Sequence, residues 1–261
     1  MERCGDHHRR NGAALLLRQS TPVCVRKYNG VITQGIVYKR KSQYFPKGSA
    51  TRNPCNLSRM LEIKHFTFGP FGTNTYVVSD GKSALLIDPA CSNEYERDML
   101  KAYIQDLRLK IEDFRIIATH GHLDHLWGAK WATETWHTPV LMHEADIPMA
   151  KAMQQQYELF GIRMKAEPFE IEPLSLQSSV FSFQIIETPG HTPGSVCLYW
   201  PDAHVLFSGD TLFETGYGRT DLPGGNMGQL ISSLDHLFTL PAATKVYPGH
   251  GGFTTIGAES R

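Results

Sequence analysis

The fold of this 261-residue chain is indicated most clearly by residues 119–125, which read THGHLDH. Three histidines and one aspartate fall within six residues, directly after a compact apolar run. His120 and His122 are two positions apart, so they lie on the same side of an extended chain. Asp124 and His125 follow at the expected start of a helix, on a different face. One segment therefore offers side chains for two adjacent sites.

Three further loops place one His or Asp beside glycine, each just after an expected strand. His191 lies in TPGHTPG at 188–194, Asp210 in SGDT at 208–211 and His250 in YPGHG at 247–251. Glycine permits a sharp turn and close approach of the backbone, and strand ends are where layered α/β folds build their sites. Imidazole and carboxylate suit zinc, iron or manganese. The sequence predicts a two-metal site built from His120, His122, Asp124, His125, His191, Asp210 and His250.

The elements between these loops alternate between the two regular kinds. A helix is predicted from an Asn93 cap, with an apolar face that continues to Leu107. Strands separated by crossing helices predict an α/β layered fold. The predicted strands are 63–68, 75–79, 83–87, 114–118, 140–142, 180–187, 196–200, 205–208 and 245–247, and the other predicted helices are 124–136, 144–160 and 227–238.

Residues 1–59 differ from the rest of the chain. They contain 12 Lys and Arg against two acids, whereas residues 60–261 contain 14 against 24. Three interpretations of this basic segment stay open: a stretch outside the natural protein, which would then start at Met60; a mitochondrial targeting peptide; or a basic arm for nucleic acid. All three predict disorder, with one folded domain at 60–261.

The composition excludes several other classes of protein. Hydrophobic residues make up 41% of the chain, enough for a sizeable core. No run reaches 18 apolar residues, so no membrane span is expected. Five cysteines without paired spacing predict free thiols in a reducing compartment. We therefore expect a cytoplasmic protein, or a mitochondrial one if residues 1–59 are a targeting peptide.

Together the four loops resemble those of the metallo-β-lactamase superfamily, from about Ile63 to the C-terminus. The resemblance implies an αββα sandwich with two divalent metals, zinc first and iron or manganese as alternatives. It also implies ligand roles, namely His120, His122 and His191 on the first metal, Asp124, His125 and His250 on the second, and Asp210 as the bridging carboxylate.

Within that superfamily the chain is most similar to the short bacterial glyoxalase II branch, the hydroxyacylglutathione hydrolases. The supporting segments are GTNTY at 72–76, GRTDLPGG at 218–225 and the GHG at 249–251. Arg219 resembles the basic position near the glutathione carboxylate in larger members, and a structural ion pair with Asp221 is the alternative. The 65 residues between His125 and His191 are expected to cover the site.

This resemblance implies a thioester hydrolase. Two metals lower the pKa of a shared water from 15.7 toward roughly 7, and the hydroxide attacks the thioester carbonyl, with Asp124 orienting it. The alternatives are a mononuclear-iron persulfide dioxygenase and a lactone or β-lactam hydrolase of the same fold. We expect a small-molecule thioester as the partner, with neither nucleic acid nor membrane. The acyl group, the thiol carrier and the oligomeric state are not readable from the sequence.

Overall fold

The computed structural model describes residues 61–107, 114–175 and 183–260, together with the backbone of three short strands nearer the N-terminus. The chain divides into two compact units, Met1–Gly35 and Ile36–Arg261. The described part of the first unit is an antiparallel pair, β1 (Arg26–Tyr28) and β2 (Val31–Thr33). Residues 1–59 were predicted to be disordered, and most of them lie outside the described residues. Where the backbone is described, at β1, β2 and β3 (Ile36–Val37), it is extended and paired instead.

The second unit begins with a seven-stranded sheet in the order β3-β4-β5-β6-β7-β8-β9. Neighbours are antiparallel from β3 to β6 and parallel from β6 to β9. Parallel neighbours need crossover connections, which α1, α2 and the segment between β8 and β9 supply. The Asn93 side chain caps α1 by accepting a hydrogen bond from the Glu96 N–H, as predicted. The bounds are β4 (Glu62–Phe68), β5 (Thr73–Ser79), β6 (Ala84–Ile87), α1 (Glu94–Asp106), β7 (Phe114–Ile117), α2 (Ala129–Trp136), β8 (Val140–Met142) and β9 (Ile171–Pro173).

A second sheet has five strands in the order β10-β11-β12-β15-β16. Only β12 and β15 are parallel, and α5 crosses between them. Asn226 caps α5 by accepting a hydrogen bond from the Gln229 N–H. A small hairpin, β13 with β14, lies between β12 and α5 in the chain. The bounds are β10 (Gln184–Glu187), β11 (Val196–Trp200), β12 (Val205–Gly209), β13 (Leu212–Phe213), β14 (Gly216–Tyr217), α5 (Met227–Leu237), β15 (Lys245–Pro248), β16 (Thr254–Thr255) and α6 (Ile256–Glu259).

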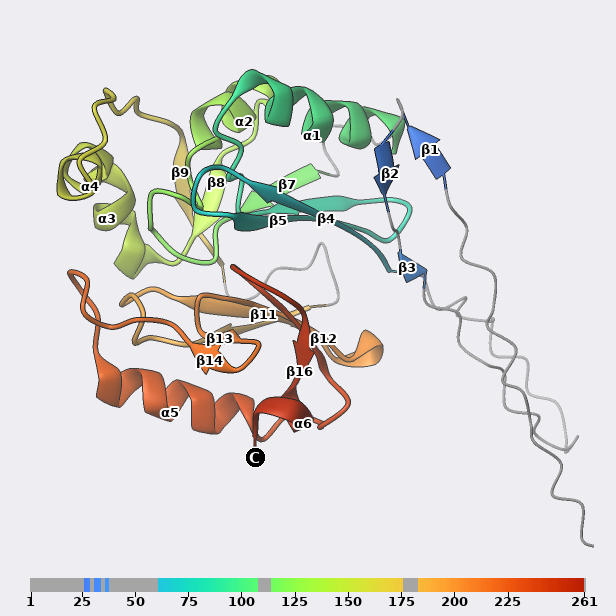
Figure 1. Ribbon diagram of the computed structural model, residues 1–261, viewed down its shortest axis with the longest axis vertical. Helices are drawn as coiled ribbons and strands as arrows, with labels where there is room; N and C mark the ends of the chain where they lie inside the picture. Colours follow the sequence, from blue (N-terminus) through green and yellow to red (C-terminus); the bar gives the residue numbers. More distant parts are fainter. Residues whose placement is uncertain are drawn as a thin grey trace, which may run out of the picture. The chain divides into compact units, whose positions relative to one another are not determined.

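Three apolar layers hold the second unit together. Side chains alternate between the faces of a strand, so Val77 of β5 faces the helical layer with Leu100 and Ile104 of α1. Tyr76 and its neighbours on the other face pack against the second sheet. The outer face of that sheet, which includes Cys197, is covered by α5 and α6. Helices therefore flank two packed sheets (Figure 1), and the predicted αββα sandwich is confirmed.

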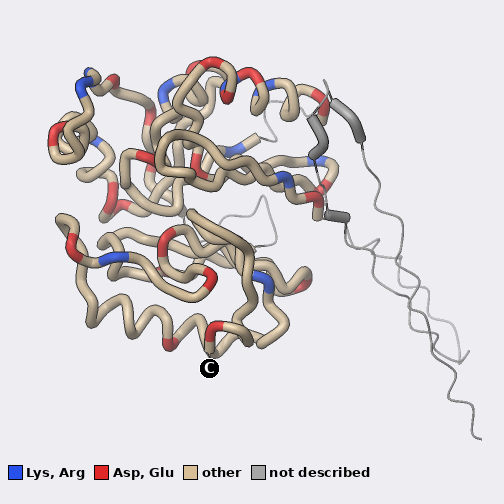
Figure 2. The backbone as a smooth tube through the Cα atoms, in the orientation of Figure 1, with Lys and Arg blue, Asp and Glu red and all other residues tan. Residues whose placement is uncertain are grey.

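The charged residues follow this layering. Strands β11 and β12 carry no Lys, Arg, Asp or Glu, and most charges lie on helices and loops (Figure 2). Within the described part of the chain, no helix is both long and apolar enough to cross a membrane.

Two of the predicted helices have the wrong bounds. The helix predicted at 124–136 begins only at Ala129, because the preceding residues form turns. The Leu126 N–H bonds to the Leu123 carbonyl, and the Gly128 N–H bonds to the Pro89 carbonyl. Asp124 and His125 therefore lie in a turn, where both side chains can face the site.

The helix predicted at 144–160 is three shorter pieces. They are the 3₁₀ turn η2 (Glu144–Asp146), α3 (Ile147–Lys151) and α4 (Met153–Leu159). One break falls at Asp146, whose buried carboxylate accepts hydrogen bonds from other loops, and a second falls at Ala152, where α3 ends. The strand predicted at 180–187 is described only as β10, because residues 180–182 lie outside the described part. Strands β9, β13, β14 and β16 and the helix α6 were not predicted.

Candidate metal centre

The loops that follow β7, β10, β12 and β15 meet at one edge of the sandwich. Backbone bonds join the two sheets there. The Asn74 N–H donates to the Gly249 carbonyl at 2.7 Å, and the Val196 N–H donates to the Thr119 carbonyl at 2.9 Å. Thr73 and His250 also form an isolated bridge. The edge is therefore fixed by both sheets rather than by one loop.

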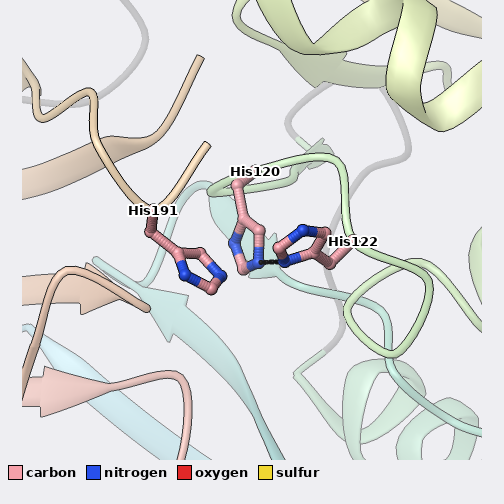
Figure 3. Close-up of side chains that lie close together, drawn as sticks. All are labelled: His120, His122 and His191. Carbon is pink, nitrogen blue, oxygen red and sulfur yellow. Dashed lines mark hydrogen bonds between the residues drawn. The ribbon is translucent and has the colours of Figure 1, made fainter. Parts of the chain in front are cut away.

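One group at this edge consists of His120, His122 and His191. Each offers a ring nitrogen, and these nitrogens lie within 4.8 Å of one another. Figure 3 shows the three rings converging, with the His120 Nε2 and His122 Nδ1 atoms 3.1 Å apart. All three side chains are buried. Three converging imidazoles could hold one metal ion.

A second group consists of Asp124, His125 and His250, whose ligand atoms also lie within 4.8 Å of one another. The His250 Nε2 atom is 3.1 Å from Asp124 Oδ2 and 3.3 Å from His125 Nε2. His125 is fully buried, whereas Asp124 and His250 are partly exposed. The second group is thus the more open side of the centre.

Asp210 lies between the two groups. Its Oδ1 atom is 3.3 Å from His125 Nε2. Its Oδ2 atom is 3.5 Å from His191 Nε2 and 3.6 Å from His250 Nε2. The seven side chains that the sequence predicted therefore come together from four loops, with one carboxylate in reach of both groups.

Hydrogen bonds on the far sides of the rings fix how the histidines point. The Nδ1 atom of His125 is 2.9 Å from Asp88 Oδ2, and that of His191 is 2.7 Å from the Arg219 carbonyl. Asp88 also accepts bonds from the N–H and hydroxyl of Thr119. Such outer partners set ring orientation and ligand basicity in metal sites. Asp88 was not predicted, although its position directly after an apolar strand, before Pro89, was a usable signal.

Asp146 is a second residue that sequence reasoning missed. Its carboxylate is fully buried and accepts bonds from the Gly121 N–H (2.8 Å), the Gly194 N–H (2.6 Å) and the Thr192 hydroxyl (2.6 Å). It therefore joins the loop of His120 to the loop of His191. Nothing in the sequence around it indicates this role, because it falls within a helical pattern.

The two groups differ in charge. Burial and the neighbouring His191 lower the pKa of His122 to about 3, and burial holds the pKa of His120 well below its usual range. Burial opposes protonation of His125 too, but Asp124 and Asp210 outweigh it and raise the pKa of His125. The aspartates thus draw positive charge to this part of the site, which a divalent cation would supply.

Two buried ligand atoms lack a hydrogen-bond partner, namely His191 Nε2 and Asp210 Oδ1. Buried polar atoms are normally paired, and both of these lie in the cluster. Gly249 leaves room there, because a Cβ atom at its position would overlap Asp210 Oδ1. Unpaired acceptors, nitrogen and oxygen donors and the absence of cysteine fit a zinc-, iron- or manganese-type centre.

Arg219 contacts this centre through its backbone carbonyl, which is hydrogen-bonded to His191. Its guanidinium forms an exposed bidentate pair with Asp221, at 2.6 and 2.7 Å. The structure thus contains the ion pair that the sequence offered as an alternative, while the Arg219 carbonyl holds His191.

Comparison with known proteins agrees with this geometry. Residues 68–250 match the metallo-beta-lactamase superfamily. The chain is 36% identical to the probable metallo-hydrolase YqgX of Bacillus subtilis, over 76% of this chain and 94% of that protein. It is 35% identical to the hydroxyacylglutathione hydrolase GloC of Haemophilus influenzae, over 70% and 86%. The crystal structure of TTHA1623 in a di-iron-bound form aligns with a TM-score of 0.68 and 37% identity, over 76% and 97%.

The chain belongs to the metallo-beta-lactamase superfamily. As a member of it, the chain is a metal-dependent hydrolase. The geometry of the His/Asp cluster fits the divalent-metal centres of this fold.

Proposed function

We propose that the chain hydrolyses thioesters of the hydroxyacylglutathione type. The observation that carries this proposal is the set of five histidines and two aspartates from four loops, in two groups that share Asp210. The likeness to GloC, a hydroxyacylglutathione hydrolase with 35% identity, supports the choice of substrate.

The proposed ligands follow the two groups. One ion would be held by His120, His122 and His191 and the other by Asp124, His125 and His250, with Asp210 in reach of both groups. Metals in such a site lower the pKa of water and polarise a carbonyl oxygen. We propose zinc first, with iron as the alternative because TTHA1623 is known in a di-iron-bound form.

The protein's own residues prepare the site for this reaction. The Thr73 hydroxyl donates to Asp124 Oδ2 at 2.7 Å and fixes that carboxylate. Burial raises the pKa of Asp124, but His125, His250 and Thr73 outweigh it and keep the pKa below its usual range. An ionised Asp124 can therefore accept a hydrogen bond from an attacking water and orient it. A thiolate leaves readily, since thiols have pKa values of about 8.5, so no general acid is required.

The test is hydrolysis of S-lactoylglutathione by the full chain and by two histidine variants. His250→Ala should lose nearly all turnover, because it removes a ligand. His236→Ala changes an exposed histidine of α5 and should keep it. Equal activity in His250→Ala would sink the proposed site. No hydrolysis by the unaltered chain, combined with oxygen uptake on glutathione persulfide, would point to the dioxygenase instead.

A further inference from the structure

A cavity of about 200 Å³ lies on the helical side of the first sheet. None of the seven candidate metal ligands lines it. Arg97 of α1, residues of α2 and α4, and the segment that leads to β9 form its walls. It is smaller than the usual range for drug-sized ligands, about 300–1,000 Å³. Any ligand it takes is therefore small.

The cavity wall combines charged side chains with apolar and aromatic ones. The side chains include Trp127, Trp131, Tyr157 and Phe169, together with two methionines. The Trp127 ring lies 6.0 Å from the Tyr157 ring, centroid to centroid. The two rings pack against each other, and the aromatic side chains offer apolar contact to a planar or aliphatic group in the cavity.

Two donors in this wall are left without partners. The Nε atom of Arg97 and the Nε1 atom of Trp127 are buried, and neither makes a hydrogen bond. Both atoms carry a hydrogen and can only donate. Buried donors normally have an acceptor. The two unpaired donors in this wall therefore favour a ligand that carries an acceptor group.

The charges in the wall decide between an anion and a cation. Lys130 is already paired with Glu134 (3.4 Å) and Glu167 (3.1 Å). This pairing leaves Arg97 and the exposed Lys165 as the lining charges without an ion pair among the described residues. An aromatic box alone would suit a quaternary ammonium group, but the unmet groups here are donors and cations. The two glutamates disfavour a ligand with two negative charges, such as phosphate.

We propose that this cavity binds a small organic monocarboxylate with an apolar body. The carboxylate accepts hydrogen bonds from Arg97 and Trp127, and the body lies among the aromatic side chains. This site is separate from the hydrolytic centre and does not depend on the substrate proposed above.

The test is calorimetric titration of the full chain with 3-phenylpropionate, with neutral 3-phenylpropan-1-ol as the matched ligand. We expect saturable binding of the acid and binding of the alcohol that is weaker by about tenfold or more, because a hydrogen bond to a charged group is lost. Arg97→Met should weaken binding of the acid by a similar factor, and Trp127→Phe by about threefold. Lys101→Met removes an exposed charge from the same helix and should change nothing.

A carboxylate could also bind at the metal centre, so His250→Ala is titrated in parallel. Binding that persists in this variant supports the cavity. Binding that is lost with His250, or that survives unchanged in both Arg97→Met and Trp127→Phe, overturns the proposal. Absence of saturable binding, or binding of choline in place of the acid, overturns it too. If Arg97→Met does not fold, as judged by circular dichroism, Trp127→Phe decides.

Discussion

The carboxylate of Asp146 joins two of the loops that carry histidines, although it coordinates nothing itself. Asp146→Asn keeps the shape but turns an N–H₂ group toward donors at Gly121, Gly194 or Thr192. A buried donor left unpaired costs about 1–3 kcal/mol. We expect the free energy of unfolding in urea to fall by that amount.

The matched control for this substitution is Asp235→Asn, which changes an exposed aspartate of α5 and should leave unfolding unchanged. If Asp146→Asn unfolds at the same urea concentration as the unaltered chain, the buried carboxylate does not hold the loops together.

A substitution at Arg219 tests the proposed substrate most directly. Its exposed guanidinium can exchange Asp221 for a substrate carboxylate, because exposed ion pairs contribute little. Arg219→Met should raise KM for S-lactoylglutathione by about tenfold with little change in kcat, since a bond to a charged group is lost from binding. Arg163→Met, also exposed, is the control. An unchanged KM would remove Arg219 from the substrate site.

At the scale of single residues, the candidate metal ligands could be predicted from the sequence, but the residues that hold them in place could not. Each candidate lies in a glycine-containing loop after a strand, which is a local signal. Asp88 and Asp146 act through contacts 25 to 48 positions away in the chain. Such contacts depend on how the layers pack, and the sequence pattern around Asp146 is that of an ordinary helix.

Among the elements, α5 and the His191 loop depend on each other at Gly190. The Asn226 N–H donates to the Gly190 carbonyl at 2.8 Å, and a Cβ atom on Gly190 would overlap the backbone of Leu230. Gly190 also has a φ of 139°, which side chains rarely adopt. Gly190→Ala should therefore destabilise the fold by about 1–3 kcal/mol through overpacking, in addition to the strain of the positive φ, and should displace His191.

Gly81→Ala separates these two causes. Gly81 has a φ of 84°, but no atom lies within 4 Å of an added Cβ. This variant should lose only about 1–2 kcal/mol from backbone strain and keep its bound metal. Equal losses of stability and of metal in both variants would show that α5 does not position the His191 loop.

Element prediction succeeded where local periodicity is strong. The helix from Asn93 and the buried strands β11 and β12 were predicted within a residue or two. It failed where a long-range contact overrides a helical pattern, as at Asp146, and where the chain turns to aim Asp124 and His125 at the site. Strands of two or three residues, such as β13 and β14, are too short to show any period.

In the molecule as a whole, three apolar layers bury the described thiols. Burial raises the pKa of Cys91 to about 12 and that of Cys197 to about 11. Their alkylation by iodoacetamide in the native protein should therefore stay slow and keep rising with pH up to pH 10, whereas the rate of an ordinary thiol of pKa about 8.5 levels off above that pKa. Peptide mass spectrometry would locate the label.

The same shifts set the sign of a stability effect. Because the folded pKa values exceed the unfolded ones, the unfolded chain loses its thiol protons first, and stability should fall as pH rises from about 9 toward 11. Urea unfolding at stepped pH measures this fall. Rapid labelling of native Cys91 or Cys197 at pH 8 would contradict the burial of these layers.

The central claim is a two-metal centre, and elemental analysis of the purified full chain tests it most directly. The seven converging side chains predict about two divalent ions per chain, falling in both the His250→Ala and Asp210→Ala variants and unchanged in His236→Ala. About one iron per chain, or content that does not change in these ligand variants, would contradict the account.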